Sequence, residues 1–583
     1  MPTLEWIGKS KVINHHQEVP FRVLERQYSY DEQGQHEEDN GSENMIIRGD
    51  NLEALKALLP RYEGRVKCIY IDPPYNTGNE GWVYNDNVND PKIKKWLGEV
   101  VGKEGEDLTR HDKWLCMMYP RLKLLQKLLA EDGVIFISID DTEYANLKLT
   151  CDEIFGNNCF VSNISWQRTY STRNDSKGIV NEVEHLLVYS KQPDWNPNKL
   201  PRTEEMNSKY KNPDNDRTLW RTDNAFAPGA ATHQGMVYAI QHPFTGQMLY
   251  PSNGACWRYQ QDQMLEIMRG WCDYELRDLN DAHERAVVCG VADEDVRQGV
   301  QAIVLSEPLD VSAKKAQAVY ERGQWPRFFF TKGGKGGIAR KTYLENVGGK
   351  LPTNFWPFSE TGHTDEAKKE MLAIFDGKAT FDTPKPRRLL EFVLKVAGSE
   401  DALVLDSFAG SGTTAHAVLN MNKADGGHRK FILVEMMDYA DSITAERVKR
   451  VIHGYGEGKT GVEGTGGNFN FYDLGEPLLV GDCLNEAVAP EKIREYIWFM
   501  ETKTPYAPLS SGNPYYLGQH NSTGYYFYYE PQRVTVLDYA FLATIKEKAD
   551  GTVIYADRCS IGEDKLAQMG ITFKKIPRDI SRL

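Results

Sequence analysis

The sequence predicts an α/β protein built on a mixed, mostly parallel sheet, with one domain inserted into the sheet and a small α/β domain after it. Two apolar runs, residues 66–71 and 402–405, have the length and the β-branched content of buried strands. Each run ends abruptly in a turn rich in proline or glycine, and the second turn opens a helical pattern over residues 413–421. Because ligands bind at the carboxyl edge of a parallel sheet, the two strand ends form the candidate site.

The first strand end carries the segment Asp72-Pro73-Pro74-Tyr75. Its prolines stop the hydrogen-bonded ladder and stiffen the turn, so the acid and the aromatic ring stand in fixed positions. Three groups here could hold a planar exocyclic amino group: a carboxylate, a carbonyl left without a ladder partner by proline, and an aromatic ring that can stack on a base. Such a segment also arises by chance, and a plain strand-terminating turn is the alternative interpretation.

The second strand end, at Asp406, runs into a turn of small residues with Gly410 and Gly412. Glycine lets the backbone approach a ligand closely, and the following helix offers unpaired N–H groups. The next predicted strand, residues 430–434, ends at Glu435, close to where a doubly wound sheet places an acid on a ribose diol. The turn lacks the third glycine of the dinucleotide fingerprint and the lysine of a phosphate-binding loop. A nucleoside without pyrophosphate, S-adenosylmethionine, fits better, and a plain βαβ turn is the alternative.

In this order, the two motifs resemble those of the DNA amino-methyltransferases in the permuted arrangement of their β group. Further segments are similar to the modification (Mod) subunits of type III restriction systems, over most of the first 470 residues: 49–55, 133–141, 184–191, 362–367 and 383–386. The resemblance implies a Rossmann-like methyltransferase fold with S-adenosylmethionine as the methyl donor. The implied substrate is the N6 amino group of an adenine flipped out of double-stranded DNA.

The resemblance also assigns roles to individual residues. Tyr75 stacks on the base, and Asp72 and the Pro73 carbonyl accept the N6 hydrogens, so catalysis is alignment plus preorganised electrostatics. The implied catalytic residues are Asp72, Pro73, Pro74 and Tyr75. The implied cofactor residues are Asp50 at the adenine, Glu435 at the ribose, Asp406 and Lys385 at the methionine end, and Phe408, Gly410, Gly412 and Thr413 along the cofactor. No nucleophile or metal is required.

Three other functions remain open at this point. Cytosine-N4 members of the group typically carry Ser where this chain has Asp72. Enzymes that methylate protein glutamine or RNA usually carry N-P-P-Y and place the cofactor motif first. A non-catalytic DNA-recognition subunit could keep the fold, but the intact Asp72, Tyr75 and glycines argue against it. The amino-acid sequence does not reveal the DNA sequence recognised or the strand methylated, because base-reading side chains follow no simple code.

The composition is that of an ordinary globular protein, with 583 residues, 40% hydrophobic and 26% charged. The length predicts roughly two to four domains. No apolar run approaches the ~20 residues that span a membrane, and the chain starts without a secretory signal pattern. The nine cysteines include no C-x-x-C pair and the thirteen histidines form no metal-binding cluster. We therefore expect no metal, reduced thiols and a cytoplasmic protein, encoded by a prokaryote or phage if the resemblance holds.

The net charge of −14 is unusual for a DNA-binding protein, but binding depends on the local field. Residues 327–341 contain five basic residues and no acid, interleaved with aromatic residues and glycine pairs. This pattern suits phosphate contact, although a solvated glycine-rich loop is the alternative. The predicted DNA-binding residues are Arg327, Lys332, Lys335, Arg340 and Lys341, with a second cluster at Arg168 and Arg173.

The elements follow in order. Residues 49–62 predict a helix capped by Asp50 or Asn51. Residues 114–129 predict a helix kinked at Pro120, 133–139 a buried strand and 387–396 the helix before the second motif. Residues 79–111 form a long charged connection at the mouth of the active site. Short strands near 534–537, 552–557 and 571–577 predict the α/β tail.

The predicted organisation is an N-terminal arm (1–44), a catalytic domain in two segments (45–165 and 351–467), a target-recognition insertion between them (166–350) and a C-terminal α/β domain (468–583). The polar, acidic stretch 28–44 is expected to be a mobile or wrapping segment. The resemblance further implies a homodimer that docks a helicase-nuclease (Res) subunit. An arm with apolar anchors, and a tail beyond what methyl transfer requires, are consistent with such partners.

Overall fold

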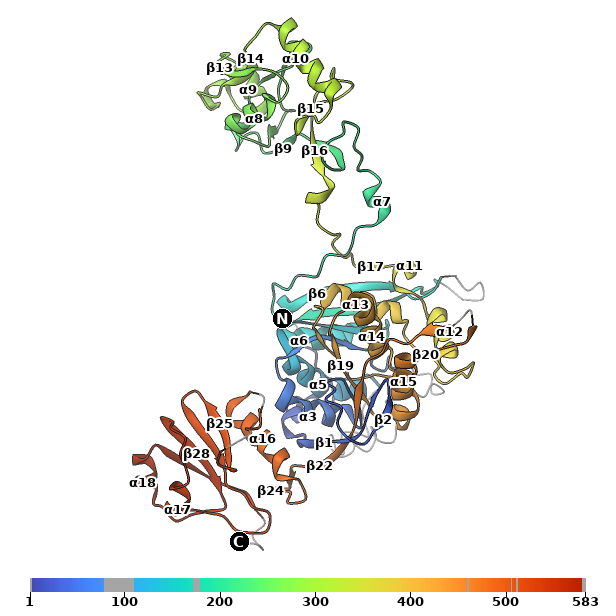
Figure 1. Ribbon diagram of the computed structural model, residues 1–583, viewed down its shortest axis with the longest axis vertical. Coiled ribbons are helices and arrows are strands. Elements are labelled where there is room, and N and C mark those ends of the chain that lie inside the picture. Colours follow the sequence, from blue (N-terminus) through green and yellow to red (C-terminus); the bar gives the residue numbers. More distant parts are fainter. Residues whose placement is uncertain are drawn as a thin grey trace. The chain divides into compact units, whose positions relative to one another are not determined.

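The computed structural model describes residues 3–77, 110–170, 179–458, 461–504, 506–509 and 512–578 (Figure 1). The chain divides into two compact units. Unit 1 comprises Met1–Asn198 and Pro352–Leu583, and unit 2 comprises Lys199–Leu351. The predicted connection 79–111 lies almost entirely outside the described residues.

Unit 1 is built on a sheet of eleven strands within the described residues, in the order β17-β6-β7-β5-β4-β18-β19-β3-β22-β1-β2. The outermost strand, β17, spans Phe355–Trp356. The six central strands, from β5 to β22, are mutually parallel, and β7 and β1 join their two edges antiparallel. The bounds of the central strands are β5 Leu129–Ile139, β4 Val66–Ile71, β18 Leu403–Asp406, β19 Lys430–Glu435, β3 Met45–Arg48 and β22 Phe469–Pro477. The predicted mixed, mostly parallel α/β sheet is confirmed.

The two motif strands, β4 and β18, are direct neighbours at the centre of this sheet. Val404 pairs with Cys68, and Leu405 pairs with Ile69. All four side chains are fully buried, as expected for strands covered on both faces. Segments more than 300 residues apart in the sequence therefore end side by side at the same edge.

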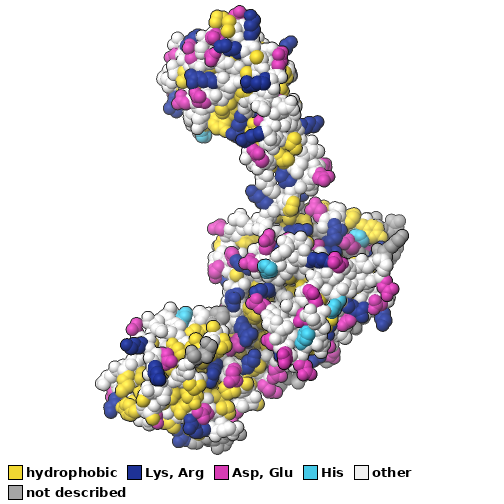
Figure 2. All heavy atoms as spheres, in the orientation of Figure 1, with side chains coloured by type: hydrophobic (Ala, Val, Ile, Leu, Met, Phe, Trp, Pro, Cys, Tyr) yellow, Lys and Arg dark blue, Asp and Glu magenta, His cyan; other side chains and the backbone are white. Residues whose placement is uncertain are grey.

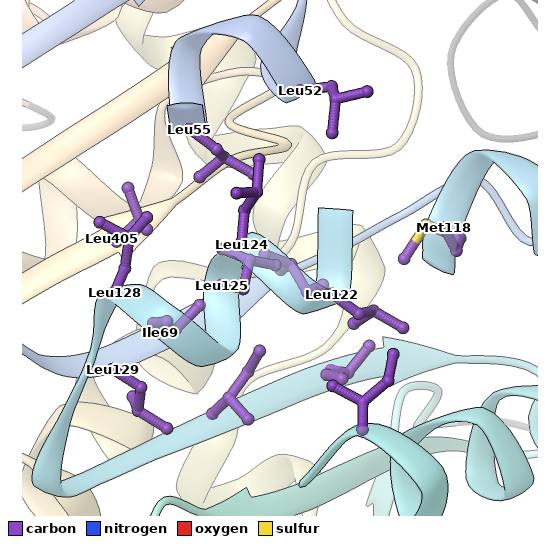
Figure 3. Close-up of a cluster of buried hydrophobic side chains, with 14 of the residues drawn as sticks. Leu52, Leu55, Ile69, Met118, Leu122, Leu124, Leu125, Leu128, Leu129 and Leu405 are labelled. Carbon is purple, nitrogen blue, oxygen red and sulfur yellow. The ribbon is translucent and has the colours of Figure 1, made fainter. Parts of the chain in front are cut away.

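Helices cover the sheet and were largely predicted. On one face lie α3 (Asn51–Tyr62), α5 (Arg110–Leu128) and α6 (Tyr144–Phe155), which contribute to one apolar core. Figure 3 shows a portion of this core, with leucines of α3 and α5 packed beside Ile69 of β4 and Leu405 of β18. Further along the chain, α13 (Arg387–Ala397) precedes β18, and α14 (Thr413–Asp425) follows it. Asp50 caps α3 as predicted, because its carboxylate accepts hydrogen bonds from the N–H groups of Leu52 and Glu53.

The structure corrects three predicted boundaries. Residues 22–31, predicted to lie in the N-terminal arm (1–44) and in part in its mobile or wrapping stretch (28–44), form β1, which pairs with β22 and with β2 (Gly34–His36). Because β22 belongs to the main sheet, the C-terminal domain starts after it rather than at residue 468. The inserted unit starts at Lys199 rather than at residue 166, because β6 (Phe160–Gln167) and β7 (Val183–Ser190) extend the main sheet. Antiparallel strands at the sides of a sheet carry weaker apolar patterns than its parallel centre, which explains the errors at β1, β6 and β7.

The C-terminal region is the predicted small α/β domain. Its four-stranded sheet has the order β25-β26-β28-β30, with bounds Tyr516–His520, Thr523–Phe527, Gly551–Ala556 and Ile571–Lys575. Helix α16 (Pro490–Thr502) packs on this sheet through Ile497, Trp498 and neighbouring apolar side chains. Within the described residues, no helix combines the length and the apolar character needed to cross a membrane.

Unit 2 has its own aromatic core, formed around two small sheets. One sheet has the order β11-β10-β14-β13, with bounds Met248–Leu249, Ile240–Gln241, Ala302–Leu305 and Tyr274–Arg277. The other consists of β15 (Phe328–Phe330), β16 (Ile338–Tyr343) and β8 (Trp220–Asn224). The unit 2 core includes Trp220, Trp257, Trp271 and Phe328–Phe330. The predicted basic segment is therefore a hairpin whose aromatic residues face inward.

Lys341 of this hairpin is a structural residue rather than a phosphate contact. Its side chain is 0% exposed and forms ion pairs with Asp214, also 0% exposed, and with Asp216. Its ammonium also donates to the carbonyl of Trp325 at 2.8 Å. The predicted role of Lys341 in DNA binding is wrong, because the buried carboxylates hold its charge inside unit 2.

Lys341→Met should destabilise unit 2 by about 3 kcal/mol or more, because removing one partner leaves buried carboxylates uncompensated. Urea unfolding of the full chain, followed by tryptophan fluorescence, measures this loss. Lys335→Met is the matched control, since Lys335 is exposed in the same hairpin. Equal unfolding midpoints for the two variants would contradict the structural role.

Candidate active site

Four acidic residues line one edge of the main sheet because parallel strands end there together. Asp72 follows β4, Asp406 ends β18 and Glu435 ends β19. Asp50 lies just after β3, the next strand, and the N–H of Gly49 bonds the carbonyl of Glu435 at 3.0 Å. The strand order thus brings together residues from four separate regions of the sequence at the edge where ligands bind.

The segment Asp72–Tyr75, called the D-P-P-Y loop below, is held rigidly. Trp114 of α5 donates from Nε1 to the carbonyl of Pro74 at 2.6 Å. The next residue, Asn76, has a φ of 59°, and its side-chain amide donates to the buried Glu143. The Tyr75 ring is 7% exposed, and its hydroxyl lies 2.7 Å from Asp72 Oδ1. The loop is a fixed template rather than a mobile surface turn.

A buried lysine joins the D-P-P-Y loop to a second carboxylate. Lys385 Nζ donates to both oxygens of Asp72, at 2.8 and 2.9 Å, and to the Tyr75 hydroxyl at 2.8 Å. It also lies 3.1 Å from Glu184 Oε1, and the Tyr75 hydroxyl lies 2.7 Å from the same oxygen. Arg168 completes the group, 3.7 Å from Glu184. We refer to Asp72, Tyr75, Glu184 and Lys385 as the acid–lysine cluster.

Burial and charge act in opposite directions within this cluster. Burial raises the pKa of Asp72 above its ordinary value, while the Lys385 ammonium opposes that rise. Burial alone would lower the pKa of Lys385, but the charges of Asp72 and Glu184 outweigh it and the pKa is raised. The lysine is therefore a cation.

The glycine turn, residues 407–412, is shaped by hydrogen bonds to two carboxylates. Asp406 accepts from the N–H of Phe408 at 3.0 Å and from the Thr414 hydroxyl at 2.6 Å. Glu435 accepts from the N–H of Gly410 at 2.8 Å. Burial raises the pKa of Asp406 to about 7, because the hydrogen bonds compensate for only some of its desolvation.

A layer of side chains packs against the glycine turn. Gly412 has a φ of +79°, and a Cβ there would lie 2.9 Å from the carbonyl of Thr444. The Thr444 hydroxyl donates to the Gly410 carbonyl at 2.6 Å, from a π-helical segment, Asp441–Ala445. Arg447 is fully buried and donates to the hydroxyls of Ser411 at 3.0 Å and Thr413 at 2.7 Å. Glycine is required where the turn meets this layer.

The residues of the glycine turn suit S-adenosylmethionine. Buried carboxylates at Asp406 and Glu435 offer acceptors for hydroxyl and ammonium groups. The hydroxyl of Ser407 is buried and has no hydrogen-bond partner within the described structure, so a polar group remains to be satisfied there. Asp50 keeps about a third of its side chain exposed beside this edge. Lys385, which the resemblance assigns to the methionine end, binds Asp72 of the D-P-P-Y loop.

Sequence reasoning missed two buried groups. Arg447 sits in α15 (Glu446–His453), which carries no motif of its own. Glu184 opens the segment 184–191, which resembles the Mod subunits, but no role was predicted for that residue. Apolar residues follow it, and a buried acid beside such a run is unusual and signals a specific partner. This acid was the one sequence feature that could have indicated a functional residue in β7.

The predicted DNA-binding residues have diverse environments. Arg327, Lys332 and Lys335 are exposed on unit 2, whereas Arg340 pairs with Asp223 at 2.6 Å. Arg168 belongs to unit 1 beside the acid–lysine cluster, and Arg173 lies outside the described residues. On the face of unit 2 drawn in Figure 2, basic and acidic side chains are interspersed.

The amino-acid sequence of this chain is similar to those of known DNA methyltransferases. The sequence profile of the DNA methylase family matches residues 66–446. The StyLTI Mod subunit of a type III restriction-modification enzyme, from Salmonella typhimurium, is 34% identical over 71% of this chain and 58% of its own length. The chain thus spans about three fifths of that relative. The type II methyltransferase M.KpnI, from Klebsiella pneumoniae, is 30% identical over 68% of this chain and 81% of its own length.

Among solved structures, the PvuII DNA methyltransferase (cytosine-N4-specific) aligns with 70% of this chain and with 86% of its own chain. The aligned residues are 14% identical, and the TM-score is 0.32. The family assignment depends on the sequence matches. The profile covers more than half of the chain, and M.KpnI is matched over most of its length. On these matches, the chain belongs to the DNA methylase family.

Proposed function

We propose that the chain transfers a methyl group from S-adenosylmethionine to N6 of a flipped-out adenine in double-stranded DNA. The observation that carries the proposal is the parallel pairing of β4 with β18, which places the D-P-P-Y loop beside the glycine turn. An acid at position 72, rather than a serine, favours adenine over cytosine among family members. The family match supports DNA as the substrate.

In this proposal the chain works by alignment. Bound S-adenosylmethionine supplies an electrophilic methyl group on a sulfonium. Asp72 and the Pro73 carbonyl accept the two N6 hydrogens, which aims the nitrogen lone pair, and Tyr75 stacks on the base. As positive charge develops on N6, the buried carboxylate of Asp72 stabilises it without reorganisation. Glu435 would hold the ribose hydroxyls, Asp50 the adenine side and Asp406 the methionine end.

We further propose that the chain is the modification subunit of a type III restriction-modification system. The name of the StyLTI relative, a Mod subunit, supports this assignment. Unit 2 would then be the target-recognition domain, since it is inserted between the two halves of the main sheet. The proposal also includes a homodimer of this chain and a helicase-nuclease (Res) partner, both implied by the resemblance to the type III Mod subunits.

The N-terminal arm no longer supports the dimer. Trp6 lies 5.6 Å from the Tyr119 ring of α5, and Lys9 pairs with Glu153 at 2.9 Å. Val12 is fully buried in the core of the same chain. These anchors therefore pack on their own catalytic domain.

Asp72→Ala should abolish methyl transfer, because it removes the acceptor that aligns and stabilises the amino group. Mass spectrometry of methylated adenine, together with separate binding assays for cofactor and DNA, tests this expectation. Asp132→Ala is the control, an exposed acid at the opposite end of neighbouring β5. If Asp72→Ala keeps more than about a tenth of kcat, a loss under ~1.4 kcal/mol, the assigned role is wrong.

Replacing Arg327, Lys332 and Lys335 by alanine should weaken DNA binding and flatten its salt dependence. Each lost phosphate contact lowers the slope of log K against log salt by about 0.9. Fluorescence anisotropy over a salt series measures the slope. Lys314 and Arg322, exposed on α10 (Leu309–Arg322), provide a control pair of the same charge type. An unchanged slope in the triple variant would place the DNA surface elsewhere.

Light scattering of the purified chain tests the dimer. The proposed homodimer should have twice the chain mass of 66.4 kDa at micromolar concentration. A second measurement, with a short DNA duplex added, separates dimers that form on DNA from dimers that form in solution. A particle of single-chain mass under both conditions rules out the homodimer.

A further inference from the structure

Lys385 occupies the place on Asp72 that the proposed function reserves for the amino group of the target base. Its ammonium donates to both oxygens of Asp72, at 2.8 and 2.9 Å, and one amino hydrogen of the base would bind there. The same ammonium lies 2.8 Å from the Tyr75 hydroxyl, at the edge of the ring on which the base would stack. The ammonium and the amino group therefore compete for the same carboxylate.

Glu184 offers the displaced ammonium a second carboxylate within reach. Its Oε1 lies 3.1 Å from Lys385 Nζ, and its side chain is only 5% exposed. Glu184 belongs to β7, which pairs with both β5 and β6, so its position does not depend on the D-P-P-Y loop. A small rotation of the lysine toward Glu184 frees Asp72 for the amino group, while the ammonium keeps a buried carboxylate as its partner.

We infer that Lys385 and Glu184 act as an exchange pair of positioning residues. Without a base, Lys385 keeps Asp72 and the Tyr75 hydroxyl aligned. When the target amino group arrives, Lys385 shifts onto Glu184 and the amino group takes its place on Asp72. The ammonium stays close enough to keep Asp72 ionised and able to accept hydrogen bonds. This inference rests on the proposed function, because the competing group is the amino group of the base.

A double-mutant cycle on the full chain tests the exchange. The variants are Glu184→Gln and Lys385→Met, each close in size to the residue it replaces. Glu184→Gln removes the charge that receives the ammonium, so Lys385 stays on Asp72. We expect kcat at saturating S-adenosylmethionine to fall about 100-fold, while KM for S-adenosylmethionine is unchanged. Adding Lys385→Met removes the competitor and should recover at least about tenfold over Glu184→Gln alone.

DNA affinity provides a readout that needs no turnover. Once the methylated site is known from wild-type activity, the probe is a duplex with adenine at that site, compared with a duplex carrying purine, which lacks the amino group. Wild type should prefer adenine, Glu184→Gln should lose about tenfold of that preference, and the double variant should regain it. Glu131→Gln, which makes the same charge change at an exposed position of β5, should leave the preference unchanged.

Each outcome bears on the exchange. A double variant no more active and no more selective than Glu184→Gln overturns it and makes Lys385 a fixed structural partner. If Glu184→Gln does not fold, as judged by its melting transition, Glu184→Asp keeps the charge but shortens its reach. An adenine preference that Glu184→Asp leaves at the wild-type level would also overturn the exchange. Failure of the proposed function is recognised separately, because wild type would then leave adenine unmodified.

Discussion

The pairing of β4 with β18 is the contact on which the rest of the site depends. Cys68 and Ile69 lie beside Val404 and Leu405, all fully buried, so apolar burial on both faces of the sheet stabilises the pairing. Closing the intervening loop costs little extra for its length, because closure entropy grows only logarithmically with the number of residues. Once the strands pair in parallel, Asp72 and Asp406 must emerge at the same edge.

The inserted unit is compatible with this pairing because its chain leaves and returns at one place. Leu200 and Lys350 exchange two backbone hydrogen bonds of 2.8 Å, which tie the two connections of unit 2 together. Unit 2 also has its own aromatic core, which includes Trp220, Trp257 and Trp271.

The acids at this edge are compensated in two different ways. Asp72 and Glu184 share the Lys385 ammonium, a full positive charge. Asp406 and Glu435 receive hydrogen bonds from backbone N–H groups, and Asp406 also accepts one from a hydroxyl, yet the pKa of Asp406 stays raised to about 7. An added positive charge beside the glycine turn would offset part of the desolvation penalty of Asp406. The sulfonium of the proposed methyl donor carries such a charge, so the electrostatics and the proposed binding position agree.

The sequence by itself determined the sheet class, four of the six central strands (β4, β5, β18 and β19) with helices α3, α5, α13 and α14, and both strand-end motifs, because proline, glycine and apolar periodicity act locally. It also indicated that Asp72 and Glu435 end buried strands. Only the tertiary structure decided that β1, β3, β6, β7 and β22 belong to the main sheet, since their pairing depends on partners distant in sequence. Likewise, Lys341 became a buried ion-pair partner and Lys385 a neighbour of Asp72 because a charged side chain has no local pattern that reveals its burial. The environment of a charge depends on the packing of the whole chain, whereas the end of a strand is already encoded in the few residues that terminate it.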